Sequence, residues 1–223
     1  MTTVTNQIEC DAILFDLDGV LIDSTSCIVR HWKHWADQHG LDIHEIMRHA
    51  HGIRAIETMR MVAPQLDVEK EAMLFNAYEL EDTVGVVAIE GAYQVLAVLP
   101  VDAWALVTSA SLNLVKARFT QTALPFPQTI VTAEDVRQGK PAPEPYLVGA
   151  QRLGVAAERC VVIEDAPAGV EAGKKAGMRV IGIAATHQRE VLLEREADFV
   201  IDRLTNLKVR EARNGYHLVI QLE

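Results

Sequence analysis

Short, uninterrupted runs of apolar residues recur along this chain, and segments of helical pattern separate them. Such a run is typical of a β-strand that is buried on both faces of a sheet. Strands that alternate with helices of this length favour a parallel sheet covered by helices on both sides. The runs are AILFDL at residues 12–17, then residues 103–109, 129–135, 160–166 and 179–185, with a weaker run at 197–202.

The segments between these runs have helical pattern and comprise residues 92–99, 112–123, 144–153 and 168–176. One region departs from the alternation, because residues 24–89 contain helical pattern and no convincing strand. On the first helix expected there, Ile28, Trp32 and Trp35 share one face, as in a helix that packs against neighbours. This region therefore predicts a separate helical unit.

The predicted fold is α/β. A Rossmann-like core with a parallel sheet would comprise residues 1–23 and 90–223, and a small all-helical cap domain, residues 24–89, would be inserted after the first strand. The tail LKVREARNGYHLVIQL alternates around Asn214-Gly215, a pair that is favoured in tight turns, so we also expect a C-terminal β-hairpin.

The charge and the cysteines limit the class of partner and the compartment. The net charge of −10 argues against nucleic acid, because binding a phosphate backbone requires a basic surface. No uncharged apolar run approaches the roughly 20 residues that span a bilayer, and no secretory signal is visible. The 3 cysteines are scattered, which fits a reducing compartment. We expect a cytoplasmic monomer with no nucleic-acid or membrane partner.

Polar side chains interrupt the apolar runs where the predicted strands end. They are Asp16, Asp18, Thr108, Ser109, Glu164 and Asp165, joined by Lys140 on a proline-rich loop. In an open parallel sheet, ligands bind at the carboxyl ends of the strands. We therefore expect these side chains to meet in one site.

This combination of side chains predicts phosphate chemistry. Clustered carboxylates repel one another unless a cation lies among them, and oxygen ligands without His or Cys favour Mg²⁺. A lysine and hydroxyls beside that metal would bind the tetrahedral oxygens of a phosphate group. Aspartate is an established covalent nucleophile toward phosphoryl groups. We expect the first carboxylate to attack phosphorus, while a second one, two residues away, exchanges protons.

Four motifs, in order along the chain, carry a resemblance to a known family. They are FDLDGVLIDS (15–24), VTSAS (107–111), GKPAPEPY (139–146) and VIEDAPAGVEAGKKAGM (162–178). With these motifs the chain resembles the haloacid dehalogenase superfamily over nearly all of its length. Within the superfamily it resembles the phosphatases whose helical cap follows the first strand.

The resemblance implies a role for each acidic residue. Asp16 would be the nucleophile that forms an aspartyl-phosphate. Asp18 would protonate the leaving alkoxide and then accept a proton from the attacking water. Mg²⁺ would be held by the Asp16 carboxylate, the backbone carbonyl of Asp18 and the side chain of Asp165, with Glu164 nearby or also a ligand.

The resemblance also implies which residues hold the phosphate group. Lys140 and one hydroxyl, either Thr108 or Ser109, would bind the phosphoryl oxygens, and Lys140 would reduce the repulsion among the acids. Dehalogenases of the superfamily lack the second aspartate, which Asp18 supplies here. Carbon–halogen chemistry is therefore not expected.

The stretch HAHGIRAIETM (49–59) resembles the substrate loop of glycerol-3-phosphate, 2-deoxyglucose-6-phosphate and related sugar phosphatases. His51, Gly52 and Arg54 match a His-Gly-x-Arg pattern that faces the active site in those enzymes, and Arg54 would offer a forked donor to substrate oxygens. Glu90 stands where these relatives usually have a proline. The resemblance implies a Mg²⁺-dependent phosphomonoesterase whose partner is a small phosphorylated metabolite, namely a sugar or polyol phosphate.

Other functions compete with this interpretation. A phosphosugar mutase of the same family would carry a cap histidine where this chain has Ile28, and the phosphonate-cleaving branch needs a cap lysine, for which Lys33 is a poor candidate beside charged neighbours. An inactive regulatory or binding protein would be expected to have lost one of the acids, hydroxyls or the lysine. His31 and His34 lie on one helical face and raise the hypothesis of a transition-metal site, for which the sequence shows no third ligand.

Overall fold

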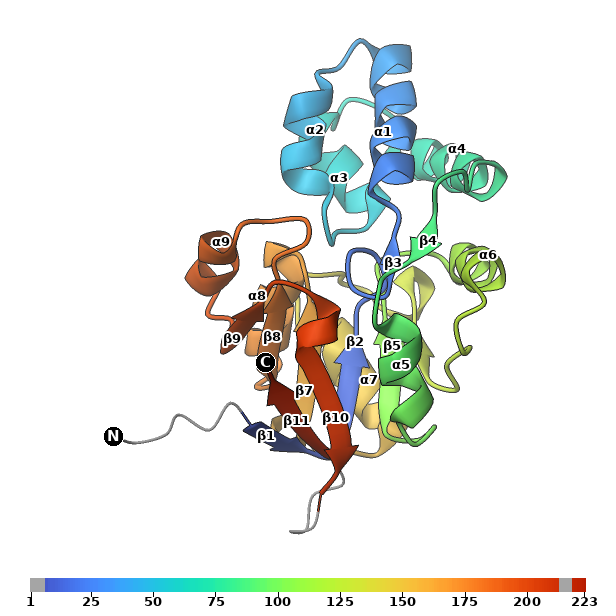
Figure 1. The fold of residues 1–223 in the computed structure, drawn as a ribbon. Coiled ribbons are helices and arrows are strands. Elements are labelled where there is room, and N and C mark those ends of the chain that lie inside the picture. Colours follow the sequence, from blue (N-terminus) through green and yellow to red (C-terminus); the bar gives the residue numbers. More distant parts are fainter. Residues whose placement is uncertain (1–6, 213–217) are drawn as a thin grey trace.

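The computed structural model describes residues 7–212 and 218–223. Its centre is a six-stranded sheet in which all neighbouring strands are parallel. The strand order is β6 (Ile130–Val131), β5 (Trp104–Val107), β2 (Ala12–Phe15), β7 (Cys160–Glu164), β8 (Arg179–Ile183) and β9 (Phe199–Ile201). Figure 1 shows helices around this sheet. The predicted α/β class is confirmed.

Alternate side chains of the central strand enter two different apolar clusters. Ile13 and Phe15 of β2 belong to one cluster, and Ala12 and Leu14 belong to the other. The first cluster includes side chains of α5 (Ala92–Val98) and α6 (Leu112–Thr122), and the second includes side chains of α7 (Glu144–Leu153), α8 (Pro167–Lys175) and α9 (Arg189–Glu194). Because both faces of the sheet are covered, each position of these strands must be apolar, which explains the uninterrupted runs.

A second, antiparallel sheet contains the C-terminus. Its strands β10 (Leu207–Glu211) and β11 (Leu218–Leu222) pair as the alternating tail predicts, while the expected turn at Asn214-Gly215 lies outside the described residues. The strand β1 (Gln7–Cys10) adds to the free side of β11. The sequence analysis does not predict β1, because only two of its four residues, Ile8 and Cys10, are apolar and buried.

The run at residues 129–135 forms a shorter strand than its sequence predicts. After β6 the chain turns into a short 3-10 helix, Ala133–Asp135. The Asp135 carboxylate accepts hydrogen bonds from the backbone N–H and the hydroxyl of Thr132, both at 2.8 Å. This local capping box competes with extension of the strand.

Four helices lie between the two-residue strands β3 (Ile22–Asp23) and β4 (Val87–Ala88). They are α1 (Thr25–His39), α2 (Ile43–Ala50), α3 (Ala55–Val62) and α4 (Val68–Glu81), which we call the α1–α4 segment. They enclose an apolar cluster of their own around Trp32, Trp35 and Phe75. Figure 1 shows the segment gathered at the end of the molecule beyond β2, joined to the rest through β3 and β4, which pair antiparallel.

The division of the chain at residues 24 and 89 stays a prediction, and the short strand β4 within that range was not expected from the sequence. Among the described residues, no helix has the length and apolar character needed to cross a membrane.

Candidate active site

A cavity of about 430 Å³ lies where the carboxyl ends of the strands face the α1–α4 segment. Most of the residues that the sequence analysis singles out line it, and they come from both the sheet and the α1–α4 segment. They are Asp16, Asp18, His51, Gly52, Arg54, Thr108, Ser109 and Asp165. The remaining two, Lys140 and Glu164, are buried directly behind Asp16.

Asp16 follows β2 and is fixed by the neighbouring strands. Its backbone N–H donates to the carbonyl of Ile163 at 3.0 Å. Nζ of Lys140 donates to Oδ1 of Asp16 at 2.7 Å, to Oε1 of Glu164 at 2.6 Å and to the carbonyl of Val107 at 3.1 Å. The ammonium group therefore connects the ends of β2, β5 and β7.

The site has more negative than positive charge. Burial raises the pKa of Asp16 to about 7, opposed by the attraction of Lys140 and reinforced by Glu164. Burial and the nearby Glu164 also raise the pKa of Asp165. For Lys140, burial alone would lower the pKa, but Asp16 and Glu164 outweigh it and raise the pKa. Three buried carboxylates thus lie around one ammonium group, which pairs with Asp16 and Glu164, so negative charge is in excess when all three are ionised.

Oxygen atoms of Asp16, Glu164 and Asp165 lie within 4.8 Å of one another. A donor set that consists of oxygen alone and carries excess negative charge fits a hard divalent cation. Lys140 offsets only part of that charge, so the residues present fit the metal ion that the motifs imply.

Every acceptor position of Glu164 is occupied. Its Oε1 accepts from Lys140 and from the hydroxyl of Tyr146 at 2.7 Å, and its Oε2 accepts from the backbone N–H groups of Asp165 and Ala166 at 3.0 and 3.1 Å. The first turn of α8 packs so closely that a Cβ atom on Gly169 would lie 1.7 Å from Oε1. Glu164 is therefore held rigidly as the partner of Lys140.

Asp165 lies against the turn that follows Asp16. Gly19 has a φ of +82°, and a Cβ atom there would lie 2.0 Å from Oδ2 of Asp165. The hydroxyl of Thr186 donates to that same Oδ2 at 2.5 Å. Only glycine allows the turn after Asp18 to approach Asp165 so closely.

Asp18 has different neighbours from Asp16. The hydroxyl of Ser24 donates to its Oδ1 at 2.5 Å, and Nη1 of Arg118 donates to its Oδ2. Arg118 belongs to α6 and is 2% exposed, so a nearly buried guanidinium supports the Asp18 carboxylate at the cavity wall.

The two candidate hydroxyls make different contacts. Ser109 donates to the carbonyl of Gly52 at 2.9 Å, across the boundary between the sheet and the α1–α4 segment. The hydroxyl oxygen of Thr108 accepts from the backbone N–H of Ala110 at 3.1 Å, which leaves its proton directed elsewhere. Thr108 is therefore the hydroxyl with a donor available to a ligand in the cavity.

The residues of the His-Gly-x-Arg pattern line the cavity, but Arg54 is already engaged. Its Nη atoms donate to Glu57 and to the carbonyls of Ala133, Val136 and Arg137, in the segment after β6. Arg54 therefore joins α3 to the sheet, and its predicted contact with substrate stays a prediction.

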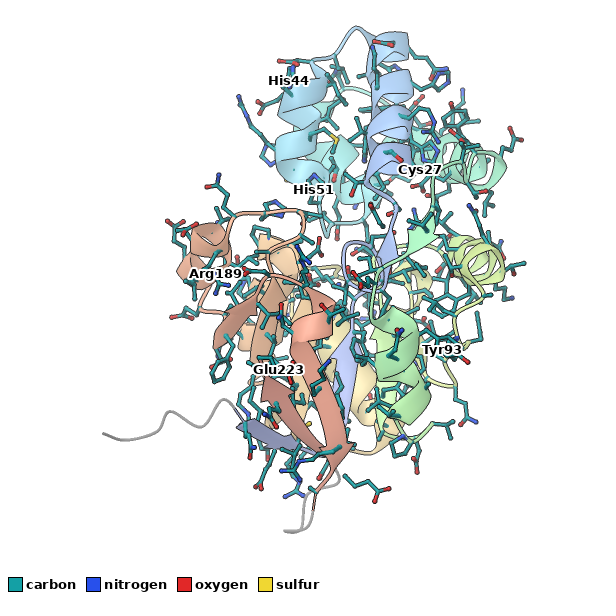
Figure 2. The ribbon with its side chains drawn as sticks, in the orientation of Figure 1. Cys27, His44, His51, Tyr93, Arg189 and Glu223 are labelled. Atoms are coloured by element: carbon teal, nitrogen blue, oxygen red, sulfur yellow. The ribbon has the colours of Figure 1, made fainter. Side chains whose placement is uncertain are left out.

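His51 lies at the end of α2 that faces the rest of the molecule (Figure 2). Its ring packs edge-to-face on that of His187, with the centroids 5.2 Å apart. Burial lowers the pKa of His51, and electrostatic repulsion from His187 lowers it further. A neutral imidazole at this position can accept or donate a hydrogen bond.

Sequence reasoning missed Arg118 and Tyr146 as members of the site. Arg118 lies four residues after Leu114 and directly before Phe119, so it occupies the buried face of α6. The sequence did contain one sign of this contact, because a single arginine on the apolar face of a helix needs an acidic partner inside the protein. Tyr146 ends the GKPAPEPY motif and gives no comparable sign of its contact with Glu164.

Three residues considered for other activities, Lys33, Ile28 and His34, lie in settings that do not serve them. Lys33 is exposed and pairs with Asp37 on the outside of α1, 2.9 Å from Oδ2. Ile28 lines the cavity, where its aliphatic side chain cannot transfer protons. His34 stacks on Tyr78 and does not join His31 in a ligand pair.

Comparisons with known proteins identify the family of the chain. A family model described as a haloacid dehalogenase-like hydrolase matches residues 13–183. The chain is 40% identical to hexitol phosphatase A of Escherichia coli (strain K12), in an alignment that covers 92% of this chain and 97% of that protein. It is 35% identical to 2-deoxyglucose-6-phosphate phosphatase 2 of Saccharomyces cerevisiae (strain ATCC 204508 / S288c), with 97% and 96% of the two chains covered.

Among solved structures, a hydrolase from Pseudomonas syringae matches with a TM-score of 0.79, and the match covers 87% of this chain and 94% of that chain. The sequence identity of this pair is 22%, so the match supports the fold alone. The chain belongs to the haloacid dehalogenase-like hydrolase family. The resemblance carried by the four motifs is thereby confirmed.

Proposed function

We propose that this protein is a Mg²⁺-dependent phosphomonoesterase that hydrolyses small sugar or polyol phosphates through an aspartyl-phosphate on Asp16. One observation carries the proposal: Asp16 reaches the cavity in contact with Lys140, beside two further buried carboxylates. The names of the relatives, a hexitol phosphatase and a 2-deoxyglucose-6-phosphate phosphatase, support the substrate class.

In the first step, a carboxylate oxygen of Asp16 forms a bond to phosphorus while the bond from phosphorus to the substrate oxygen breaks. Asp18 donates a proton to the leaving oxygen, which departs as an alcohol. In the second step, the oxygen of a water molecule forms a bond to the same phosphorus while the bond from phosphorus to the Asp16 oxygen breaks, Asp18 takes a proton from that water, and inorganic phosphate is released. At the end of the cycle Asp16 is again a free carboxylate and Asp18 is again protonated, so both are ready for the next substrate.

The surrounding residues would hold the phosphoryl group. Mg²⁺, bound by Asp16, the backbone carbonyl of Asp18 and Asp165, would supply positive charge that offsets the repulsion between phosphate and carboxylates. Lys140 and the hydroxyl of Thr108 would donate to phosphoryl oxygens. Glu164, whose acceptors are all in use, would position Lys140.

The organic part of the substrate would lie against the α1–α4 segment, so residues 24–89 would act as the specificity cap. The wall there combines apolar Ile28, Trp32 and Phe75 with Asn76 and Glu79. The two arginines of the lining, at 54 and 118, already pair with Glu57 and Asp18. A hydroxyl-bearing, uncharged group fits this wall better than a second phosphate.

The phosphosugar mutase is the less supported alternative, because Ile28 occupies the wall position at which those enzymes were expected to carry a histidine. We also propose that the protein acts in the cytoplasm as a monomer without nucleic-acid or membrane partners. Its net charge of −10 and three buried, unpaired cysteines support this setting.

Phosphate release from p-nitrophenyl phosphate and from hexitol and hexose phosphates, with and without Mg²⁺, tests the proposal. Asp16→Asn should abolish release from every substrate, and equal activity of this variant would contradict the assignment. Product analysis from hexose 1-phosphates separates the two enzymes, since a mutase would yield an isomerised phosphosugar with little free phosphate.

A further inference from the structure

A second group of metal-ligating side chains lies in the α1–α4 segment, apart from the carboxylates at the sheet. It consists of Cys27 and His31 on α1 and Asp82 directly after α4, and their ligand atoms all lie within 4.8 Å of one another. Sγ of Cys27 lies 3.3 Å from Nε2 of His31, which lies 3.4 Å from Oδ2 of Asp82. Figure 2 shows Cys27 near the start of α1, toward α4.

The local structure brings these residues close together, and an ion would require the His31 ring to turn, because Sγ of Cys27 lies beside the ring, 3.3 Å from Nε2 and 3.9 Å from Nδ1. Cys27 and His31 are four residues apart, so their side chains lie one above the other on the helix. Both are buried, with exposed fractions of 1% and 0%, whereas the Asp82 side chain reaches solvent at 20%. Asp82 thus gives an ion a route from solvent to a thiol and an imidazole.

The separations fit a tetrahedral metal ion. Bonds of about 2.3 Å to sulfur and about 2.0 Å to nitrogen or oxygen place neighbouring ligand atoms about 3.3–3.6 Å apart in a tetrahedron. Two of the three separations in the structure, 3.3 and 3.4 Å, are close to those edges, and the third, from Sγ to Oδ2, is within 4.8 Å.

The neighbours of the ligands also resemble those of a metal site. Nδ1 of His31 lies 3.9 Å from Oε1 of Glu79 and also 3.9 Å from Sγ of Cys27. Arg30 donates to both oxygens of Asp82, from Nε at 2.5 Å and from Nη2 at 2.8 Å. A hydrogen-bonded, fixed orientation of the ligating carboxylate is typical of metal centres.

Without an ion, the thiol and the ring nitrogen share one partner. Sγ of Cys27 donates to the backbone carbonyl of Asp82 at 3.0 Å, and Nε2 of His31 also lies 3.0 Å from that oxygen. Metal uptake would replace these contacts: the thiol would lose its proton to solvent, and the proton that Nε2 directs at the carbonyl would move to Nδ1 or to solvent, which frees the Nε2 lone pair for the ion. Binding therefore tightens as the pH rises.

We propose that Cys27 Sγ, His31 Nε2 and Asp82 Oδ2 form a site for a thiolate-binding divalent ion of the zinc class, distinct from the Mg²⁺ site. Thiolate and imidazole ligands select such ions over Mg²⁺. The ion would join the helix that follows β3 to the residues that precede β4. It would therefore fix both connections of the α1–α4 segment to the sheet.

Titration of the metal-free, full-length protein with Co²⁺ tests the proposal, because only a thiolate ligand gives a near-ultraviolet sulfur-to-cobalt charge-transfer band. The carboxylates near Asp16 cannot produce this band. We expect one equivalent of Co²⁺ to generate it, Cys27→Ser to remove it, and Cys160→Ser, a change at another buried thiol, to retain it. No band in the unaltered protein, or an equal band in Cys27→Ser, would overturn the proposal.

A second measurement uses Zn²⁺ affinity, determined by competition with a chromophoric chelator. His31→Gln should weaken binding by at least about 10-fold, whereas His34→Gln, at the ring that stacks on Tyr78, should not change it. Zn²⁺ should also raise the Tm of the unaltered protein and not that of Cys27→Ser. Equal affinity and an equal Tm shift in all variants would exclude the site, whatever the outcome of the phosphatase assays.

Discussion

At the scale of single residues, the two aspartates of FDLDG differ in their neighbours although one residue separates them. Asp16 contacts Lys140 in the interior, while Asp18 contacts Ser24 and Arg118 at the cavity wall. The sequence predicts the pair and its unequal roles. It does not reveal the arginine, because that contact joins residues 100 positions apart.

Arg118→Met should lower kcat by about 100-fold with little change in KM, because a carboxylate that loses its support no longer meets the leaving oxygen correctly. Steady-state kinetics with a hexitol phosphate measure the two constants. Arg118→Lys should recover part of kcat, since it restores a cation near Asp18. A parallel fall in Tm and protein yield with unchanged kcat would instead assign Arg118 to folding alone.

Gly19→Ala should raise the Mg²⁺ concentration needed for half-maximal activity by roughly 10-fold or more. The new Cβ atom would displace Oδ2 of Asp165. A positive φ would also cost the alanine about 1 kcal/mol of backbone strain. Gly154→Ala is the matched control, because Gly154 also has a positive φ, +69°, but no atom lies within 4 Å of a Cβ there. Equal Mg²⁺ dependence in the two variants would refute the steric argument.

At the scale of elements, the strand ends were predictable and the contacts across the cavity were not. Uninterrupted apolar runs place Asp16, Thr108 and Asp165 at neighbouring strand ends, because a parallel sheet aligns those ends. The contact of Gly52 with Ser109, by contrast, depends on how the α1–α4 segment packs against the sheet. The short length of β6 was not predicted either, because the hydrogen bonds of Asp135 to Thr132 form a turn that ends the strand within the apolar run.

Gly52→Ala should raise KM for hexitol phosphates several-fold and leave kcat for p-nitrophenyl phosphate nearly unchanged. A Cβ atom at Gly52, where φ is +74°, would lie 2.8 Å from Cβ of Ala166 and push the loop around Gly52 away from the sheet. Gly40→Ala, at a positive φ with open space around it, controls for backbone strain. The same KM in both variants would count against a role of this contact in substrate binding.

At the scale of the whole molecule, the three buried carboxylates beside one ammonium group link stability to metal binding. In the metal-free protein, Asp165→Asn should raise Tm, because it removes one of three buried carboxylates that share a single ammonium group. Added Mg²⁺ should raise the Tm of the unaltered protein and reverse the order of the two proteins. Thermal unfolding at several Mg²⁺ concentrations measures both effects, and a Tm that is insensitive to Mg²⁺ in both proteins would argue against the metal site.

The central claim is that phosphate passes through a covalent bond to Asp16. It is tested most directly by mixing the protein with a ³²P-labelled hexitol phosphate and Mg²⁺, quenching with acid within one turnover, and mapping the labelled peptide. We predict hydroxylamine-sensitive label on the peptide that contains Asp16, and none in Asp16→Asn. Release of labelled phosphate without any label on the protein, or label on another peptide, would contradict the account.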